Sequence, residues 1–165
     1  MALLRDGGAD PVLMVTGAAP MSLPGVITAH NPGWRTGMGS SFILGLRTLP
    51  ADRDAVVIAL VDQPLIGPQA VRRLIAAFVE GAGVAVACYD GQPRNPVLIG
   101  RTYWAQAADA AQGDVGARAF LRAHPDLVTA VECGDVGRAD DLDTPDDFAR
   151  ISALLVDRGA AAAQG

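Results

Sequence analysis

The segment Val56-Val57-Ile58-Ala59-Leu60-Val61-Asp62-Gln63-Pro64 decides the fold class of this chain. Its continuous apolar run, rich in β-branched residues, predicts a strand that is buried on both faces, because a strand with one wet face would alternate. The run ends in a carboxylate, and Pro64 stops it. In open α/β sheets, ligands bind beyond the carboxyl ends of the strands, so a functional site is expected at Asp62. The alternative is an Asp that only caps the following turn.

Short apolar runs of this kind alternate with segments of helical period along the chain, which predicts an α/β domain whose helices cover a mostly parallel sheet. The expected strands are Val12 to Thr16, Val26 to His30, Ala55 to Val61, Val84 to Cys88, Pro96 to Ile99 and Leu127 to Cys133. A helix over Pro68 to Glu80 places four apolar residues on one face, namely Val71, Leu74, Ile75 and Phe78.

Two further helices are expected near the C-terminus. One begins after Asp114, which is available to cap it, and buries a face that contains Ala117, Phe120, Leu121 and His124. The last begins at Thr144-Pro145, where Thr can cap and Pro suits the first turn, and it is expected to bury Phe148, Ile151 and Leu155.

Composition limits the class of protein. The 165 residues, half of them hydrophobic, predict one domain over residues 1–156 and a disordered Ala-rich tail at 157–165. A net charge of -5 argues against nonspecific nucleic-acid binding. The apolar runs are too short to span a membrane and the start has no export signal, so a cytoplasmic protein is expected. All 13 basic residues are Arg, which excludes mechanisms that need a lysine ammonium.

Cys88 and Cys133 lie in different apolar segments without the spacing of a metal site. Buried free thiols are therefore expected.

Asp62 and Asp143 are the candidate metal ligands. Mg²⁺ takes oxygen ligands, commonly one or two protein carboxylates together with substrate phosphates. Asp143 precedes the expected helix cap and is free to point elsewhere, whereas Asp146 and Asp147 are explained as acids in the first helical turn. If the two segments meet in the fold, Asp62 and Asp143 complete a two-carboxylate site.

A second candidate segment is Asn31-Pro32-Gly33-Trp34-Arg35-Thr36-Gly37-Met38-Gly39-Ser40-Ser41, between an expected strand and a helix. Its glycines permit close backbone approach to a ligand, and the helix N-terminus is expected to present unpaired amides and serine hydroxyls. The alternative is a simple loop in which Ser40 caps the helix.

The segments described above belong to an ordered set of six motifs. The six are Asn31-Pro-Gly-Trp34, Gly37 to Ser41, Asp62-Gln63-Pro64, Gly91-Gln-Pro-Arg-Asn95-Pro96-Val97, Gly113-Asp114-Val-Gly-Ala-Arg118 and Asp141-Leu-Asp143-Thr-Pro145. In order and spacing this set resembles the MobA-like nucleotidyltransferase family, and most closely the molybdenum cofactor cytidylyltransferases, from about Gly7 to about Leu155.

The resemblance implies a Rossmann-like three-layer α/β fold and transfer of CMP from CTP to the phosphate of molybdopterin, with Mg²⁺ as cofactor. By the family pattern Asp62 is the catalytic residue and principal metal ligand, assisted by Asp143. The residues that the pattern assigns to the nucleotide are Gly37, Met38, Gly39, Ser40 and Asp62. Those that it assigns to the acceptor are Asn95, Pro96, Asp114 and Arg118. Family members commonly carry His where Asn95 stands.

The implied partners are CTP or another NTP, molybdopterin or a related small phosphorylated acceptor, and a molybdoenzyme or chaperone. The family also has a leading strand that runs into Leu-Ala-Ala-Gly-x-x-x-Arg-x-Gly and a Lys, and this sequence contains no such segment. A gap is therefore expected between the strands at Val12 and Ala55, and slow or no turnover is expected of the chain as written. Two function classes remain open: a nucleotidyltransferase, for CTP or for another nucleotide or acceptor, and a catalytically silent binding module.

Overall fold

The computed structural model describes residues 1–152 of the chain. Within them it has six strands, at all the positions that the sequence predicts. Leu155, the predicted tail at 157–165 and the predicted domain end at residue 156 lie outside the described residues.

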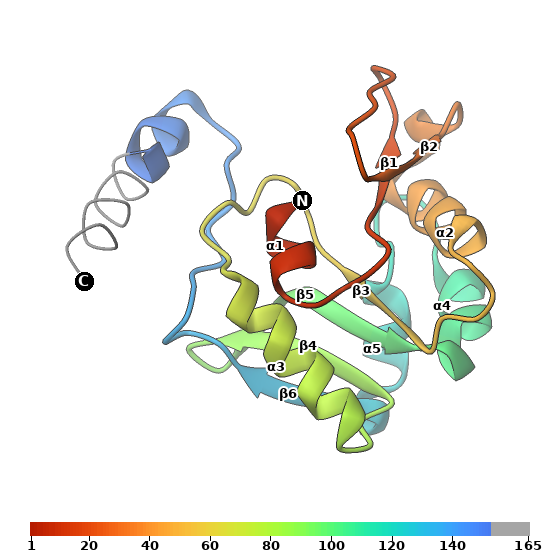
Figure 1. The fold of residues 1–165 in the computed structure, drawn as a ribbon, viewed down its shortest axis with the longest axis vertical. Coiled ribbons are helices and arrows are strands. Elements are labelled where there is room, and N and C mark those ends of the chain that lie inside the picture. Colours follow the sequence, from red (N-terminus) through yellow and green to blue (C-terminus); the bar gives the residue numbers. More distant parts are fainter. Residues whose placement is uncertain (153–165) are drawn as a thin grey trace.

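A four-stranded sheet forms the centre of the molecule, in the order β3 (Ala55–Ile58), β5 (Gln92–Gly100), β4 (Val84–Tyr89) and β6 (Val128–Glu132) (Figure 1). β5 is antiparallel to both of its neighbours, and β4 and β6 are parallel. All six residues of β4 are buried, as expected of a strand that is paired on both edges and covered on both faces.

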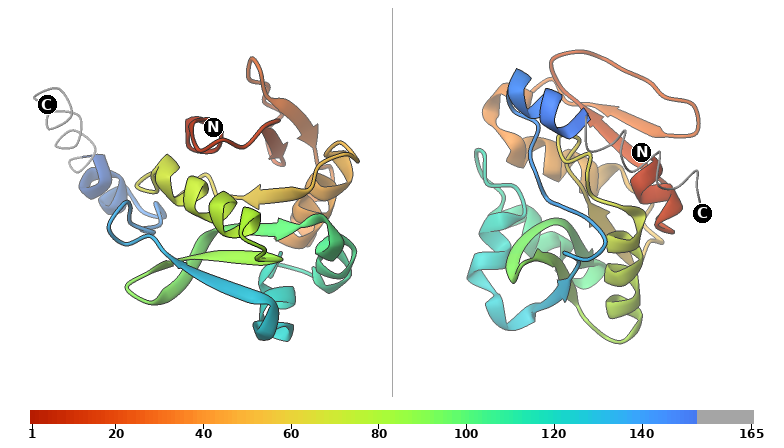
Figure 2. Two further views of the ribbon diagram at one scale, coloured as in Figure 1. Left: turned by 60° about the horizontal axis from the view of Figure 1, so that its bottom comes forward. Right: turned by 90° about the vertical axis from the view of Figure 1, so that its left-hand side faces the viewer.

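Helices cover both faces of this sheet (Figure 2). Alternate residues of a strand point to opposite faces. On one face, Ala85 and Ala87 pack against α3 (Pro68–Val79). On the other, Val84 and Val86 form a core with residues from α2 (Met38–Thr48), α4 (Trp104–Ala110) and α5 (Arg118–Ala123). The arrangement is the three-layer α/β fold that the sequence predicts.

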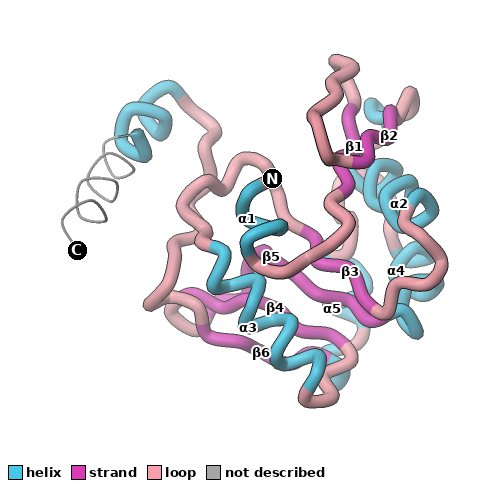
Figure 3. Tube along the Cα trace, viewed as in Figure 1, coloured by secondary structure: helices cyan, strands magenta, loops and turns pink. Residues whose placement is uncertain are grey.

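The N-terminal strands form a second sheet of two parallel strands, β1 (Leu13–Thr16) and β2 (Ile27–His30), and β1 contacts α2 (Figure 3). No strand within residues 1–152 pairs β1 with β3. Both line one cavity of about 2000 Å³, which also reaches Asp62, and we call it the inter-sheet cavity. The predicted gap between these strands is therefore present, and it divides the sheet in two.

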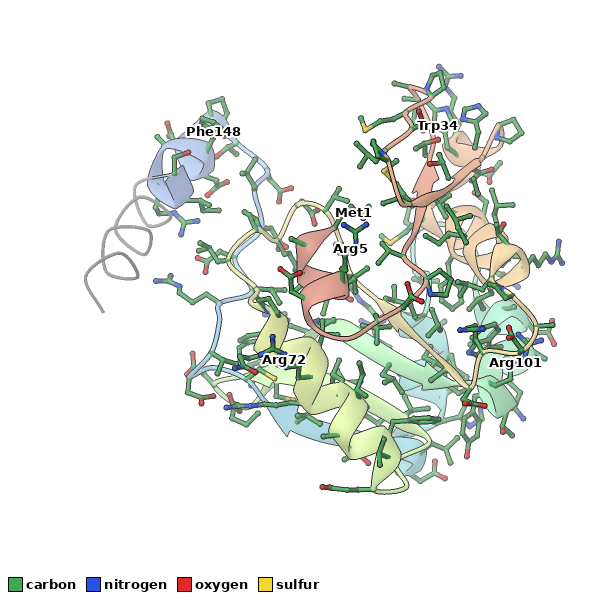
Figure 4. The ribbon with its side chains drawn as sticks, viewed as in Figure 1. Met1, Arg5, Trp34, Arg72, Arg101 and Phe148 are labelled. Carbon is green, nitrogen blue, oxygen red and sulfur yellow. The ribbon has the colours of Figure 1, made fainter. Side chains whose placement is uncertain are left out.

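The first helix, α1 (Ala2–Asp6), has only five residues. A helix this short does not form alone, so it depends on tertiary contacts. It packs against α3, where Arg72 donates two hydrogen bonds to the carbonyl of Asp6 (2.8 and 3.2 Å; Figure 4).

Two details of the expected helices are wrong. Asp114 does not cap α5, which starts at Arg118, and instead accepts a hydrogen bond from the Met38 amide. Phe148 is 61% exposed and lies on a helical segment, residues 145–152, that stands apart from the sheet (Figure 4), whereas Ile151 is buried as expected. None of the helices in residues 1–152 is both long and apolar enough to cross a bilayer.

Candidate active site

Asp62 lies four residues beyond β3, which ends at Ile58 rather than at Val61. Its carbonyl accepts a hydrogen bond from the Leu142 amide at 2.8 Å. The next residue, Gln63, is buried and donates from Nε2 to Asp141 Oδ1 at 2.7 Å. Two adjacent residues thus clamp the segment that leads into Asp143. The structure brings together the two segments whose meeting the sequence left open.

The oxygens at this point suit a hard cation. Asp62 Oδ1 is buried and accepts no hydrogen bond from the described residues. A buried carboxylate oxygen without a donor is costly unless a cation meets it. Residues 1–152 contain no cluster of three or more His, Cys, Asp or Glu that could hold a metal by itself. Mg²⁺ commonly takes only one or two protein carboxylates, with phosphates and water as its other ligands, so Asp62 and Asp143 remain the carboxylates predicted for it.

The loop before α2 is held by the buried Asn31. Its Nδ2 donates to the hydroxyls of Ser40 (2.8 Å) and Ser41 (3.0 Å), and its Oδ1 accepts from the Gly33 amide (2.9 Å). The Ser40 hydroxyl in turn donates to the carbonyl of Gly37 at 2.9 Å. These bonds fix the loop against the first turn of the helix, so the Ser40 hydroxyl is engaged within the protein.

The start of α2 also contacts the loop at residues 113–114. The Gly39 amide donates to the Gly113 carbonyl at 2.8 Å, and the Met38 amide donates to Asp114 Oδ1 at 3.3 Å. The expectation of unpaired amides at this helix end is therefore wrong for Met38 and Gly39, because a neighbouring loop supplies their acceptors. Gly37 is required here: its φ is 111°, and an added Cβ would lie 2.3 Å from the Gly113 carbonyl.

The remaining predicted residues come from β5 and α5. β5 has a bulge at Asn95 and Pro96, since Val86 faces Val97 while Ala87 faces Arg94. A bulge redirects the side chains of a strand, here at the wall of the inter-sheet cavity. Six predicted residues line this cavity, namely Met38, Asp62, Asn95, Asp114, Arg118 and Asp143. Four others do not line it and belong to the supporting backbone, namely Gly37, Gly39, Ser40 and Pro96.

Arginines brace the acidic segment beside Asp62. Asp140 accepts from Arg138 (2.9 Å) and from Arg150 (2.7 Å). These hydrogen bonds, first from Arg138 and then from Arg150, hold the pKa of Asp140 below its usual range. Arg138 precedes Asp143 in the sequence and Arg150 follows it. The two bonds to Asp140 therefore hold together the chain on both sides of Asp143.

Burial sets the protonation state of the two thiols and of one tyrosine. Cys88 and Cys133 are buried and free, as expected, and burial raises the pKa of both. A raised pKa keeps a thiol protonated and unreactive. Burial likewise raises the pKa of Tyr89.

Asn31 and Gln63 are positioning residues to which the sequence analysis gave no role. Both belong to motifs that the sequence shows, and both are polar residues next to a proline after a strand. Their burial, 6% and 5% exposed, is the property that identifies them. Burial of an amide requires partners, and these partners are the two loops that carry the site.

Comparison with known proteins identifies the family of the chain. The chain matches the MobA-like NTP transferase domain family over residues 1–128. It is 32% identical over 158 residues to nicotine blue oxidoreductase of Paenarthrobacter nicotinovorans, covering 88% of this chain and 76% of that protein.

Two crystal structures share the fold. The Rv0371c homologue from Mycobacterium sp. strain JC1 has a TM-score of 0.74 at 26% identity and covers 94% of this chain and 80% of its own. Rv0371c of Mycobacterium tuberculosis H37Rv, in complex with manganese, has a TM-score of 0.70 at 24% identity and covers 90% and 81%. The family match and the shared α/β fold thus identify a nucleotidyltransferase. The chain belongs to the MobA-like NTP transferase family.

Proposed function

We propose that the domain binds Mg²⁺ and CTP at Asp62 and serves the transfer of CMP to the phosphate of molybdopterin. The observation that carries the metal assignment is the buried Asp62 Oδ1, which has no donor among the described residues and is held beside the segment of Asp143. The manganese in the Rv0371c crystal structure supports a divalent cation. CTP and molybdopterin rest on the motif resemblance described above.

In this reaction an oxygen of the acceptor phosphate attacks the α-phosphorus of CTP, and the bond to pyrophosphate breaks. Mg²⁺, when bound, would neutralise the negative charge that develops on the phosphates. Asp62 would hold that cation, and the backbone at Gly37 to Gly39 would border the base and ribose. Asn95 and Arg118, on the wall of the same cavity, would face the acceptor. No proton has to pass through a histidine.

Calorimetry with Mg²⁺ and CTP tests the metal assignment. Asp62→Asn is expected to abolish Mg²⁺-dependent CTP binding, because it removes the charge of the principal ligand while keeping the shape. Asp146→Asn is the matched control, since it makes the same change on an exposed residue that the site does not use. Equal CTP binding by Asp62→Asn and the unchanged protein would refute the assignment.

The base preference is a separate proposal. CTP is expected to raise the melting temperature more than GTP at equal concentration, since ligand binding stabilises by mass action. The resemblance through Gly37 to Ser41 is nearer to cytidylyl than to guanylyl enzymes. A larger shift with GTP would reverse the preference.

Residues 1–165 alone are proposed to bind CTP with little turnover. Asp62, Asp114 and Asp143 line the inter-sheet cavity. Of the arginines that line it, Arg94, Arg118 and Arg122 are exposed, and Arg53 and Arg150 are paired with aspartates. Such a wall leaves much of a triphosphate's charge uncompensated, and losing one preorganised donor already costs about a hundredfold in rate. Pyrophosphate release at about one per second or faster would contradict this proposal.

Nicotine blue oxidoreductase, named for redox chemistry, raises a second candidate function. A redox enzyme would consume NADH or NADPH in the presence of a dye substrate. Absorbance at the nicotinamide band distinguishes this activity from nucleotidyl transfer.

A further inference from the structure

A second pocket, of about 360 Å³, lies beside the turn between β4 and β5, where that turn meets the segment after β6 (Figure 2). We call it the hairpin pocket. Its volume falls within the range of roughly 300–1,000 Å³ that is typical of small-molecule sites. The inter-sheet cavity shares Arg94 with it but contains neither Tyr89 nor Arg138, so the two spaces adjoin without being the same. The lining of the hairpin pocket includes Tyr89, Gln92, Arg94, Gly134, Gly137 and Arg138.

The walls of the hairpin pocket are held in place by Glu132. Asp90 and Gly91 both have positive φ values, 52° and 73°, as in a two-residue type I′ turn. The Glu132 carboxylate accepts from the Gly91 amide of that turn (3.2 Å) and from the Gly134 amide of the next segment (2.8 Å). The bond from Gly134, and then that from Gly91, lowers the pKa of Glu132, so the carboxylate stays ionised at neutral pH. The turn and the segment are therefore fixed to one another without a ligand.

The register of the hairpin places three side chains of the pocket on one face of the sheet. Tyr89 is opposite Gln92, and Ala87 is opposite Arg94. Opposite residues of a strand pair, and alternate residues of one strand, point to the same face. Gln92 is therefore the direct neighbour of Tyr89, and Arg94 is its diagonal neighbour. Diagonal neighbours lie about 7–8 Å apart, a distance that aromatic and long side chains can span.

Tyr89 brings an unused hydrogen-bond donor to this face. The residue is only 8% exposed, and its hydroxyl is buried without a partner among residues 1–152. Burial raises the pKa of Tyr89, so the hydroxyl keeps its proton and is able to donate. A buried hydroxyl without a partner is costly, so this group indicates a polar ligand that accepts its hydrogen bond.

The neighbouring cations indicate that the ligand is an anion. Arg94 is exposed and, within residues 1–152, forms no ion pair; its hydrogen bond there runs to the adjacent Pro93 carbonyl at 3.4 Å. Arg138 donates to Asp140 from Nε and Nη2, and in the same part of the chain its Nη1 has no acceptor. Asp140 also accepts from Arg150, which balances its charge. Guanidinium groups of this kind recognise carboxylates and phosphates.

We propose that the hairpin pocket binds a small polar anion, with its carboxylate or phosphate between Arg94 and the hydroxyl of Tyr89. Gln92 and Asp90 are exposed and line the same pocket, and they accept hydrogen bonds from hydroxyl groups on the rest of the ligand. This site is separate from the proposed binding of Mg²⁺ and CTP at Asp62, so it is tested without either of them.

Glycerol 3-phosphate and glycerate are the phosphate and carboxylate probes, and glycerol is the neutral control. Calorimetric titration of the full chain, without Mg²⁺ or nucleotide, should show saturable binding of at least one acid at millimolar concentration and no binding of glycerol. The acid that binds more tightly identifies the acidic group of the ligand. In an NMR titration, the amides of Gly134 and Gly137 and the Nε of Arg94 should shift with the same affinity.

Tyr89→Phe removes the hydroxyl and keeps the ring. It should weaken the tighter probe at least about tenfold, the effect of one hydrogen bond to a charged group. Tyr103→Phe is the matched control, since Tyr103 lines neither the hairpin pocket nor the inter-sheet cavity, and it should leave the affinity unchanged. Without a probe, the urea midpoint of Tyr89→Phe should equal or exceed that of the unchanged protein, because the hydroxyl has no partner to lose.

Arg94→Gln should likewise weaken the tighter probe at least about tenfold, because it removes the charge that faces the anion. Arg122→Gln is its matched control. It makes the same change on an exposed arginine that lines the inter-sheet cavity but not the hairpin pocket, and it should leave the affinity unchanged.

Absence of saturation by both acids up to about 50 mM, or equal affinity of Tyr89→Phe and the unchanged protein, would overturn the proposal. Equal losses in Arg94→Gln and Arg122→Gln would also overturn it, since the anion would then lie in the inter-sheet cavity. So would a lower urea midpoint of Tyr89→Phe without a probe, because the hydroxyl would then already have a partner in the folded protein.

Discussion

The two sheets of this molecule differ in burial. β4 is buried at every position, whereas β2 is exposed at three of its four residues and half-buried at the fourth. β4 has a strand on each side and a helix layer on each face, whereas within residues 1–152 β2 pairs with β1 alone. Burial therefore follows the number of neighbours as well as the sequence, since β2 also contains the polar residues Thr28 and His30.

The difference in burial predicts that the four-stranded sheet contributes more to stability than the two-stranded sheet. A two-stranded sheet is marginal without support, and here the support is α2, which contacts β1. The loop from Asn31 to Gly37 leaves from β2, on the less buried side, while Asp62 leaves from the four-stranded sheet. The candidate site thus joins a stable part and a part with fewer buried contacts.

The comparison predicts its largest effect in the core of the four-stranded sheet. Ile99 is fully buried, while Ile27 in β2 is 37% exposed. Ile99→Ala should lower the free energy of unfolding by about 2–5 kcal/mol, from lost burial and the cavity left behind. Ile27→Ala, the matched change, should cost about 1 kcal/mol or less. Urea denaturation measures both, and equal losses would refute the division.

A second test concerns Gly37, where the start of α2 contacts the loop at residues 113–114. Gly37 and Gly81 have nearly equal φ values, 111° and 109°, but an added Cβ meets the Gly113 carbonyl at 2.3 Å at the first and nothing within 4 Å at the second. Gly81→Ala should cost backbone strain alone, about 1–3 kcal/mol. Gly37→Ala should cost about 1–3 kcal/mol more, because the loop has to move. It should also weaken CTP binding, and equal losses in the two variants would show that the contact is slack.

Asn31 provides a smaller test on the β2 side. Asn31→Ala leaves two hydroxyls and one amide without their partner and should cost about 1–3 kcal/mol. Ser41→Ala removes one of these bonds and should cost about 1 kcal/mol. Thermal or urea unfolding compares the two variants. If Asn31→Ala loses no more free energy of unfolding than Ser41→Ala, water replaces the hydrogen bonds of Asn31.

The sequence predicts the elements of the fold well and the contacts of the site less well. The positions of strands and helices follow from the spacing of apolar residues and from the Gly and Pro residues that end each element. Both signals come from residues close together in the sequence. That Asp62 meets Leu142, or that Asp114 serves Met38 rather than α5, depends on residues about 80 positions apart. Phe148 shows the same limit: the helix is expected from the period of its residues, but the exposure of Phe148 depends on tertiary contacts. The gap beside β3 was predictable only through the family pattern.

The smallest expected effect concerns Asp140, which ties Arg138 to Arg150 around Asp143. Its pKa is lowered in the folded protein, so its contribution is present at pH values above about 4, the ordinary pKa of Asp, and is lost as the pH falls through the lowered value. Because both arginines are about half-exposed, solvent screens the pair, and about 1 kcal/mol or less is expected. Asp140→Asn should therefore unfold slightly earlier than the unchanged protein at pH 7, and the difference should vanish near pH 2. Asp52→Asn is the control, since Asp52 pairs only with the adjacent Arg53 and ties no distant segments. Urea midpoints from pH 2 to 7 measure the difference, and one that grows as the pH falls would show that Asp140 is not held by its arginines.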